Sequence, residues 1–537
     1  MKQKKEENIK LPNRRIHVNR KKPEEKKRSK NPLKRLIILI VLIALISFVS
    51  YVVKNLYTFQ KLSKEMFNAT YSTVYDSNKN VIAKIGNERI RERVEFSDIP
   101  ENLINAYISI EDQRFYSHHG IDVKRTGAAI LSYVTKKGHT SFGGSTITQQ
   151  LVKNLTGNNS NSISRKVKEW FYAWDLEAFF SKEEILGAYF NIIYKGPNIY
   201  GVQAASHYYF NKNVQDLTLA ECAFLAGINN SPNSYNPFTD TDRTDKISTR
   251  TKTVLNKMLE LGYVTQDEHD NATIEVNNGL NFNNGSFTQK DSTITSYHTD
   301  ALINEIISDL SKSKNITQEF STNYFYLSGS SIYSTVNNDI QNMIEKEFKN
   351  NKYIIHSSNS DATSQSAFIL IDNSTGYVIG CVGGLGEKTS YRSFNRATQM
   401  KRQTGSAMKP IAVLLPAIDK KIVTNVTLLD DNPSTFVDYQ GHLYSPIDYD
   451  KYKGTITLRQ AVETSQNIPF VKIMEQLTAQ TSINYLKKMG ISTLNDNDIN
   501  LSLALGGLDE GISPLEFAGA YSVIANDRSI QRTYFLH

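Results

Sequence analysis

The sequence predicts a multi-domain protein in which an apolar N-terminal helix precedes a mainly α-helical domain and an α/β domain. Three observations predict this fold class. An uncharged apolar run fills residues 36–53, residues 70–262 have mostly helical periodicity, and strand-like runs alternate with helical ones after Ser328. A chain of 537 residues with 39% hydrophobic side chains is long enough to form two or more cores.

The apolar run LIILIVLIALISFVSYVV, residues 36–53, contains no charged side chain. As an α-helix it would be about 27 Å long, which is close to the hydrocarbon thickness of a bilayer. A signal peptide is the alternative, but its apolar core would be shorter and followed by small residues at a cleavage site. We therefore expect an uncleaved transmembrane helix over residues 36–54.

Residues 1–35 form a basic tail, with 15 Lys and Arg against 4 Asp and Glu. Because the whole chain carries a net charge of only +8, the rest of it is slightly acidic. Nucleic-acid binding by the main body therefore has no support from composition. The positive-inside rule predicts a single-pass protein of the cell membrane, with a cytoplasmic tail and residues 55–537 outside the cell.

Residues 263–327 differ in composition from the segments on either side. Asn, Ser and Thr dominate them, as in NNGLNFNNGSF and SKSKNITQEFSTN. This composition is typical of a linker or a poorly packed connector. We therefore expect a first domain over residues 70–262 and a second over residues 328–537.

The segment EDQRFYSHHG, residues 111–120, places two acids at the end of an amphipathic helix. On a helix drawn over residues 103–115 at about 100° per residue, Glu111 lies within the apolar arc and Asp112 faces away. Desolvation raises the pKa of a carboxylate toward the range useful for a general base. Glu111 is therefore a candidate base, although a paired structural acid would give the same pattern.

The segment GGSTITQQLVKNL, residues 143–155, opens a second predicted helix with glycines and hydroxyls. Backbone N–H groups at such a helix start are suited to an anion, and Lys153 follows two to three turns later.

A third helix is predicted from SRKVKEWFYAWDLEAFF, residues 164–180. Its apolar stripe consists of Val167, Trp170, Phe171, Trp174 and Ala178. Arg165 and Glu169 lie opposite this stripe with Lys166 alongside, which a solvated face with an i,i+4 pair would also explain. Together with Glu111, these charges fit transfer of a sugar away from a phosphate leaving group. The base would deprotonate an attacking hydroxyl, and the cations would stabilise the departing diphosphate.

The order of these motifs resembles that of the peptidoglycan glycosyltransferases. EDQRFYSHHG, GGSTITQQLVKN, RKVKE, KEEILGAYFN and RTKTVLNKM follow one another, with SPNSYNPF between the last two. The chain resembles the first half of a bifunctional, class A penicillin-binding protein. That resemblance implies a lysozyme-like helical domain that polymerises lipid II into glycan strands, with inversion at the anomeric carbon.

The resemblance also implies roles for individual residues of the first domain. Glu111 resembles the catalytic base and Glu169 the second acid. The diphosphate-facing cations would be Lys153, Arg165 and Lys166, and the glycan-site motif would include Gln150, Ser145 and Thr146. His118 and Arg250 also match motif positions, where we expect structural support rather than chemistry. A divalent cation, Mg or Mn, is the usual helper of this family.

Three positions depart from the family pattern. Gly187 stands where Glu is more usual, Lys195 where Phe is common, and Asn211 where Gly is common. These positions are expected in the wall of the domain and not at the two acids. We therefore expect the same activity as in the family.

The second domain carries a Ser-x-x-Lys pair in QTGSAMKPIAVLLPAID, residues 403–419. One helical turn separates Ser406 from Lys409, so the amine could take the proton of the hydroxyl. Ser465-Gln466-Asn467 follows, and both elements resemble those of a penicillin-binding transpeptidase domain. The resemblance implies that Ser406 forms an acyl-enzyme with peptide stems or β-lactams. Lys409 would act as base, Ser465 as proton relay and Asn467 as the group that orients the substrate amide.

The third element of that fold, Lys-Thr-Gly, does not occur after Asn467. In this fold the motif borders the active site and supports the oxyanion side. We therefore expect a truncated transpeptidase domain, with little or no D,D-transpeptidase activity in this chain.

Two alternatives to a polymerising enzyme stay open. A glycan hydrolase of lysozyme-like fold would also use a catalytic Glu. A non-catalytic cell-wall scaffold would instead act through its tail and its second domain. The expected partners are lipid II and the growing glycan strand, peptide stems, β-lactams, the membrane and other cell-wall synthesis or division proteins, with no nucleic acid.

Overall fold

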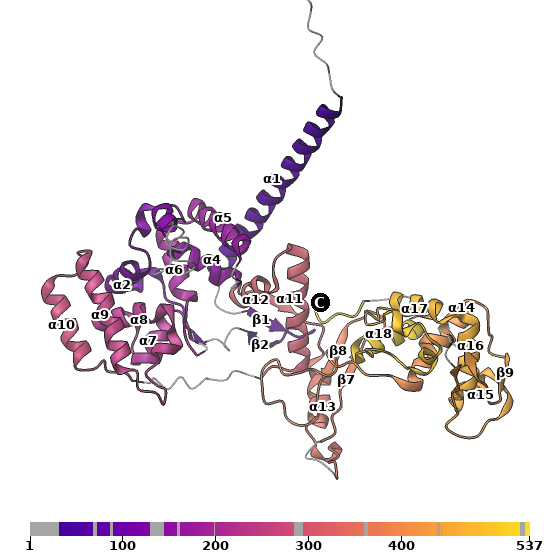
Figure 1. Ribbon diagram of the computed structural model, residues 1–537. Helices are drawn as coiled ribbons and strands as arrows, with labels where there is room; N and C mark the ends of the chain where they lie inside the picture. Colours follow the sequence, from indigo (N-terminus) through magenta and orange to yellow (C-terminus); the bar gives the residue numbers. More distant parts are fainter. Residues whose placement is uncertain are drawn as a thin grey trace, which may run out of the picture. The chain divides into compact units, whose positions relative to one another are not determined.

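The computed structural model describes most of the chain beyond residue 31 (Figure 1). The described residues are 32–67, 72–85, 90–128, 144–157, 160, 162–197, 199–283, 294–358, 363–437, 441, 443–526 and 532–537. They form two compact units, Met1–Tyr57 and Thr58–His537. Residues 1–31 of the predicted basic tail lie outside the described residues.

Helix α1, Pro32–Phe67, contains the whole predicted apolar segment. Leu36, Ile40, Ile43 and Ile46 are exposed along it. Among the residues that the structure describes, no helix is found that is long and apolar enough to cross a membrane. The last turns of α1 belong to the second unit, where the ring of Phe59 stacks on that of Tyr172 with 4.1 Å between centroids.

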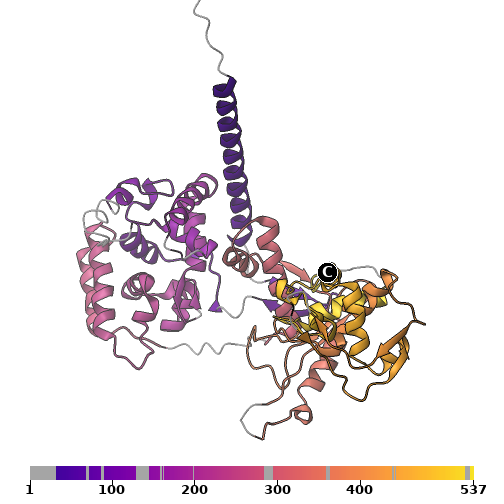
Figure 2. The same ribbon diagram turned by 45° about the vertical axis from the view of Figure 1, so that its right-hand side comes forward.

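The first domain is mainly helical, as predicted, and its helices gather into one body (Figures 1 and 2). They are α2 (Glu101–Glu111), α4 (Ile147–Thr156), α5 (Ile163–Phe179), α6 (Lys182–Ile192), α7 (Val202–Phe210), α8 (Leu219–Gly227) and α9 (Thr244–Glu260). A small sheet pairs β5 (Ile199–Tyr200) with β3 (Ile90–Arg91) and β4 (Tyr194–Gly196).

The core of this domain forms because each helix buries one apolar face. Leu103, Ala106 and Tyr107 lie on the buried face of α2, and α8 is buried along almost its whole length. Thr218 begins α8 with a capping box to Glu221, which satisfies backbone N–H groups that would otherwise be buried without partners. This packing fixes the end of α2, where Glu111 lies.

The segment expected to be a poorly packed linker is instead helical. It contains α10 (Gln266–Asn277), α11 (Tyr297–Lys314) and α12 (Gln318–Leu327). Thr265, Ser296 and Thr317 are the N-caps of these helices, and each accepts a backbone N–H through its hydroxyl. In the described parts of this segment, residues 263–283 and 294–327, polar side chains thus serve as helix caps and on exposed helix faces.

Residues 72–85, at the start of the predicted first domain, pair instead with a strand from far along the chain. Strand β1 (Ser72–Tyr75) lies between β2 (Val81–Ile85) and β6 (Ser331–Tyr333), antiparallel to the former and parallel to the latter. A separate core cluster joins this sheet to α11, and it includes Val74, Ile85 and Leu302.

The second domain mixes helices with short strands, as predicted. Its described helices are α13 (Asn338–Phe348), α14 (Leu415–Asp419), α15 (Leu458–Glu463), α16 (Ile468–Leu477), α17 (Ala479–Lys488) and α18 (Pro514–Ala525). Its described strands form antiparallel pairs: β7 (Phe368–Ile371) with β8 (Val378–Val382), β9 (Leu428–Asp431) with β12 (Gly454–Thr457), and β10 (Phe436–Val437) with β11 (Leu443–Tyr444).

Candidate functional site

The two acids at the end of α2 differ from the expected arrangement. The helix ends at Glu111 rather than continuing to residue 115, and Asp112 leaves the helical conformation with φ −155° and ψ 74°. Asp112 is fully buried, while Glu111 is half-buried. The prediction that Asp112 faces away was wrong because it extended the helix past its real end.

Asp112 connects the end of α2 to the start of α4. One of its carboxylate oxygens, Oδ2, accepts a hydrogen bond from the backbone N–H of Ile147 at 2.9 Å and is 2.9 Å from Nε2 of His118. The predicted anion site at the start of α4 is thus occupied by a carboxylate of the chain itself, which favours the positive end of the helix dipole.

Glu111 receives an amide hydrogen bond on each carboxylate oxygen. Nε2 of Gln150 donates to Oε2 at 2.8 Å, and Nδ2 of Asn229 donates to Oε1 at 3.1 Å. Gln150 lies on α4, and Asn229 lies in the 3₁₀ turn Ile228–Asn230 that follows α8. These two donors hold the carboxylate in one orientation.

Two further buried groups complete the surroundings of Glu111. The hydroxyl of Tyr189, on α6, donates to Oε1 of Gln150 at 2.9 Å and accepts from Nδ2 of Asn229 at 2.9 Å. Lys195, on β4, donates to Oδ1 of Asn229 at 2.9 Å. Burial raises the pKa of Tyr189 well above its usual value, and the charge of Glu111 adds to that shift.

The second acid, Glu169, lies in a separate cluster on α5. Its side chain is buried and pairs with Arg165 and Lys166 of the same helix. Nε2 of Gln149 also donates to it at 3.2 Å. Nζ of Lys166 donates to the hydroxyl of Ser145 at 2.7 Å, so this predicted site residue joins the cluster. Since Gln149 and Gln150 are neighbours on α4, the two acids flank one helix.

The orientation of α5 overturns the alternative of a solvated charged face. Glu169 is only 5% exposed, whereas Trp174 on the apolar stripe is 59% exposed. Val167 and Phe171 of that stripe are exposed as well. The charged face therefore contacts α4 through Gln149, and much of the stripe faces away from the core.

Lys153 lies on α4, three residues beyond Gln150, and is exposed. It lines a cavity of about 660 Å³ together with residues of α12 such as Glu319 and Asn323. Lys153 therefore lies on the same helix as Gln149 and Gln150, which contact the two acids. It also lies at the edge of a cavity large enough for a polar ligand.

Three other predicted residues have contacts of a structural kind. Thr146 caps α4, and its hydroxyl donates to the carbonyl oxygen of Gly120 at 2.7 Å. His118 is paired with Asp112, and Nε of Arg250 donates to the carbonyl oxygen of Gly227 at 2.8 Å. The structural roles expected for His118 and Arg250 stay predictions.

The second candidate site is centred on Lys409. Its Nζ donates to the hydroxyl of Ser465 at 3.1 Å and to Oδ1 of Asn467 at 2.7 Å, and also to the carbonyl oxygens of Ser465 and Gln466. Burial lowers the pKa of Lys409 to about 8, while the charge of Asp448 opposes the shift. The sequence-predicted elements around residues 409 and 465–467 are therefore in contact.

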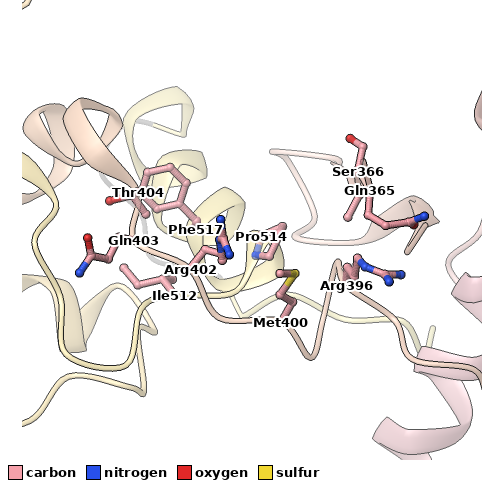
Figure 3. A pocket seen from close by; sticks show the side chains of 11 residues that line it. Gln365, Ser366, Arg396, Met400, Arg402, Gln403, Thr404, Ile512, Pro514 and Phe517 are labelled. Atoms are coloured by element: carbon pink, nitrogen blue, oxygen red, sulfur yellow. The ribbon is translucent and has the colours of Figure 1, made fainter. Parts of the chain in front are cut away.

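Ser406 lies in the 3₁₀-helix Gly405–Met408 and is exposed. Among the described residues, its hydroxyl has no hydrogen bond to Lys409, whose amine is directed to Ser465 and Asn467. A cavity of about 520 Å³ adjoins the preceding residues (Figure 3). Arg402, Gln403 and Thr404 line it together with Phe517 of α18.

Within the described ranges, no group of three or more His, Cys, Asp or Glu side chains is placed to hold a metal ion. Glu169 is paired with two cations, and both oxygens of Glu111 accept amides. This donor set does not fit a resident divalent cation.

Asn229, Tyr189 and Gln149 are site residues that the sequence did not predict, and Lys195 was expected only as a departure from the family pattern. Gln149 is adjacent to the predicted site residue Gln150, so the motif that identified Gln150 could also have identified it. Asn229 and Lys195 have no local signal, because each contacts the site from a segment far away in sequence.

Comparisons with known proteins agree with this arrangement. A family model described as Transglycosylase matches residues 78–259, and one described as Penicillin binding protein transpeptidase domain matches residues 366–537. Penicillin-binding protein 1A of Clostridium botulinum (strain Hall) is 36% identical over 471 residues, which cover 85% of this chain and 56% of that protein. Penicillin-binding protein 1F of Bacillus subtilis (strain 168) is 34% identical over 474 residues, which cover 88% and 62% respectively.

A crystal structure of penicillin-binding protein 1A from Haemophilus influenzae matches 87% of this chain and 70% of its own, at 20% identity and a TM-score of 0.44. The chain spans 56% and 62% of the length of the two curated relatives above. The two family segments occur in the order that the motifs predict, and the relatives align along most of the chain. The chain therefore belongs to the class A penicillin-binding proteins, with a transglycosylase segment followed by a transpeptidase segment.

Proposed function

We propose that this chain is a membrane-anchored peptidoglycan glycosyltransferase that polymerises lipid II, with Glu111 as the general base. The observation that carries the proposal is the pair of amide hydrogen bonds to Glu111, from Gln150 and Asn229. They hold the carboxylate in a fixed orientation, which a base needs in order to accept the proton of a sugar hydroxyl. Membership of the transglycosylase family supports the same reaction.

In this proposal the acceptor hydroxyl loses its proton to Glu111 as its oxygen attacks the anomeric carbon of the donor. The bond from that carbon to the diphosphate breaks, and the diphosphate leaves with the lipid. Lys153, Arg165 and Lys166 would stabilise its negative charge, with Glu169 holding two of these cations in place. Ser145 and Thr146 lie beside these groups at the start of α4.

A divalent cation enters the proposal only as part of the substrate. The described side chains do not form a protein metal site, so Mg or Mn would arrive bound to the diphosphate.

We also propose that residues 36–54 anchor the chain in the cell membrane, with the tail in the cytoplasm and the two enzymatic segments outside. The uncharged run of residues 36–53 and the basic tail before it support this topology. Lipid II is held in the membrane by its lipid, so an anchored enzyme would meet its substrate at the bilayer surface.

For the second segment we propose a transpeptidase-type site with little or no D,D-transpeptidase activity in this chain, in which Ser406 is the residue that would accept acyl groups from peptide stems or β-lactams. Lys409 would serve as the base, and Ser465 and Asn467 lie within hydrogen-bond distance of its amine. Other cell-wall synthesis or division proteins are the expected partners.

The test is to mix the purified full chain with lipid II in detergent and to separate the products by size. We expect glycan polymer from the wild type and at least a 100-fold lower rate from E111Q, since a general base contributes about 10²–10⁴-fold. E101Q, at the exposed first turn of α2, is the matched control and should keep its activity.

Two outcomes would replace the proposal with an alternative. Shortening of preformed glycan, with no polymer from lipid II, would identify a hydrolase. If E111Q formed polymer at the wild-type rate, Glu111 would not be the base. If neither the wild type nor any variant formed polymer, a scaffold would be favoured.

A further inference from the structure

Lys195 is a fully buried lysine close to Glu111 that the proposed reaction does not use. Its Nζ donates to the carbonyl oxygen of Leu225 at 3.0 Å and to Oδ1 of Asn229 at 2.9 Å. It also lies over the ring of Tyr107, 4.5 Å from the centroid. Each hydrogen of an ammonium group therefore has an acceptor or an aromatic face to point at.

The chemistry of this contact fixes the orientation of the Asn229 side chain. A lysine amine is only a donor when it is protonated, so the atom of Asn229 that faces it must be the oxygen. The amide nitrogen of Asn229 must then face the other way, toward Oε1 of Glu111 and the hydroxyl of Tyr189. With the amide reversed, its oxygen would face the carboxylate of Glu111 and would repel it.

The remaining hydrogen bonds around Glu111 have the same order of donor and acceptor. Tyr189 accepts from Asn229 and donates to Gln150, which leaves the amide nitrogen of Gln150 to donate to Glu111. Each carboxylate oxygen of Glu111 thus accepts a hydrogen bond from an amide N–H. The orientation of both amides follows from the hydrogen bond that Lys195 donates to Asn229.

We propose that Lys195 is a positioning residue for the glycosyltransferase reaction: through Asn229 it directs the amide donors that hold Glu111 ready as the base. This inference rests on the proposed function above. Lys195 does not touch the reacting atoms in this scheme, so its effect passes through Asn229.

Two opposing effects act on the charge of Lys195. Burial lowers the pKa of Lys195 well below its usual value, and the charge of Glu111 opposes the shift. The other titratable and charged groups near the two residues are Tyr107 on α2, Tyr189 on α6, Asp112 beyond α2, and Arg125, which donates to the backbone carbonyl of Glu111. Lys195 is the cation that reaches the Glu111 carboxylate through a single amide.

The experiment compares K195M, N229A and the double variant with the wild type in the polymerisation of lipid II. Methionine fills a similar volume but cannot donate, so we expect kcat to fall on the order of 10- to 100-fold with little change in KM. The pH profile of kcat/KM should also differ from that of the wild type, since a buried amine near the proposed base is removed. K195Q, which keeps a donor, should recover part of the lost rate.

The double variant separates a role through Asn229 from a general packing effect. If Lys195 acts through Asn229, the double variant should be no slower than the slower single variant. Additive losses, or a K195M enzyme with wild-type kcat and pH profile, would overturn the proposal. K257M, which removes a lysine paired with Glu260 on the surface of α9, is the matched control.

Two further outcomes are also decisive. Asn229 is half-buried whereas Lys195 is fully buried, so N229A should cost less stability and tests the proposal even where the Lys195 variants do not fold. Wild-type rates in N229A would overturn it. A wild-type chain that makes no polymer would instead refute the proposed function, which this design distinguishes from failure of the role of Lys195.

Discussion

Gln149 and Gln150 are adjacent on α4, yet their side-chain amides donate to different acids. Gln150 donates to Glu111 at 2.8 Å, and Gln149 donates to Glu169 at 3.2 Å. Successive residues on a helix point about 100° apart, so one short segment can support both acids without bringing them together. This relationship predicts different results for two otherwise identical substitutions.

Q150L should affect catalysis more than stability, and Q149L should do the reverse. Q150L removes one of the two donors to Glu111, and we expect the polymerisation rate to fall on the order of 10- to 100-fold. Gln149 is fully buried and closes the capping box of α4 by accepting the backbone N–H of Thr146. Q149L should therefore lower the free energy of unfolding by about 1–3 kcal/mol.

Rates with lipid II and melting temperatures, measured on both variants in the same detergent, check this contrast. A Q150L chain that melts lower than Q149L while polymerising faster would contradict it.

Replacing the buried acid Asp112 should destabilise the first domain. In D112N, the amide oxygen can take the place of Oδ2, which contacts both the N–H of Ile147 and Nε2 of His118. The amide N–H group then takes the place of Oδ1, 3.1 Å from Nε2 of His118, so that a buried donor faces a ring N–H instead of an acceptor, at a cost of about 1–3 kcal/mol. Thermal unfolding of the full chain measures the loss, and D240N at an exposed position is the control. Equal melting temperatures of the two variants would show that Asp112 does not connect α2 to α4 in this way.

The sequence was informative about which residues matter, and less so about their orientation. The motifs around Glu111, Gln150 and Glu169 identified the segments that meet in the structure. The periodicity of α5 identified residues that share a face, but it could not tell which face is covered by other helices. That information is tertiary, because it depends on where Gln149 of α4 lies.

Two other features lay beyond local reasoning. The helix containing Glu111 ends four residues earlier than the pattern indicates, since Asp112 turns toward the start of α4. Asn229 reaches Glu111 from 118 positions away, and no local pattern signals such a contact. The domain boundaries and the roles of the site residues stay predictions until they are tested.

Gly120, which ends the EDQRFYSHHG segment, should tolerate no side chain. Its φ is +80°, and an added Cβ would lie 2.4 Å from the backbone oxygen of Ala173 on α5. G120A should therefore lower the free energy of unfolding by about 2–4 kcal/mol, which combines backbone strain with a backbone clash. It should also disturb Thr146, whose hydroxyl donates to the carbonyl oxygen of Gly120.

G262A is the matched control for this substitution. Gly262 has a similar φ of +75°, but nothing lies within 4 Å of an added Cβ. Its loss should be limited to the backbone term, about 1 kcal/mol. Denaturant or thermal unfolding that gives equal losses for the two variants would show that α5 moves away from residue 120 without cost.

Lys409 should make any acylation of Ser406 depend on pH near 8. Burial lowers the pKa of Lys409 to about 8, and only the neutral amine can take a proton from the serine hydroxyl. The fraction of neutral amine rises as pH increases through that value. The second-order rate constant for acylation by a fluorescent penicillin, even if it is small, should therefore increase from pH 7 to 9. S406A gives the background, and K409R should abolish the dependence because arginine stays protonated. A rate that is flat or falls over this range would mean that Lys409 is not the base, and that its four hydrogen bonds to residues 465–467 serve the fold alone.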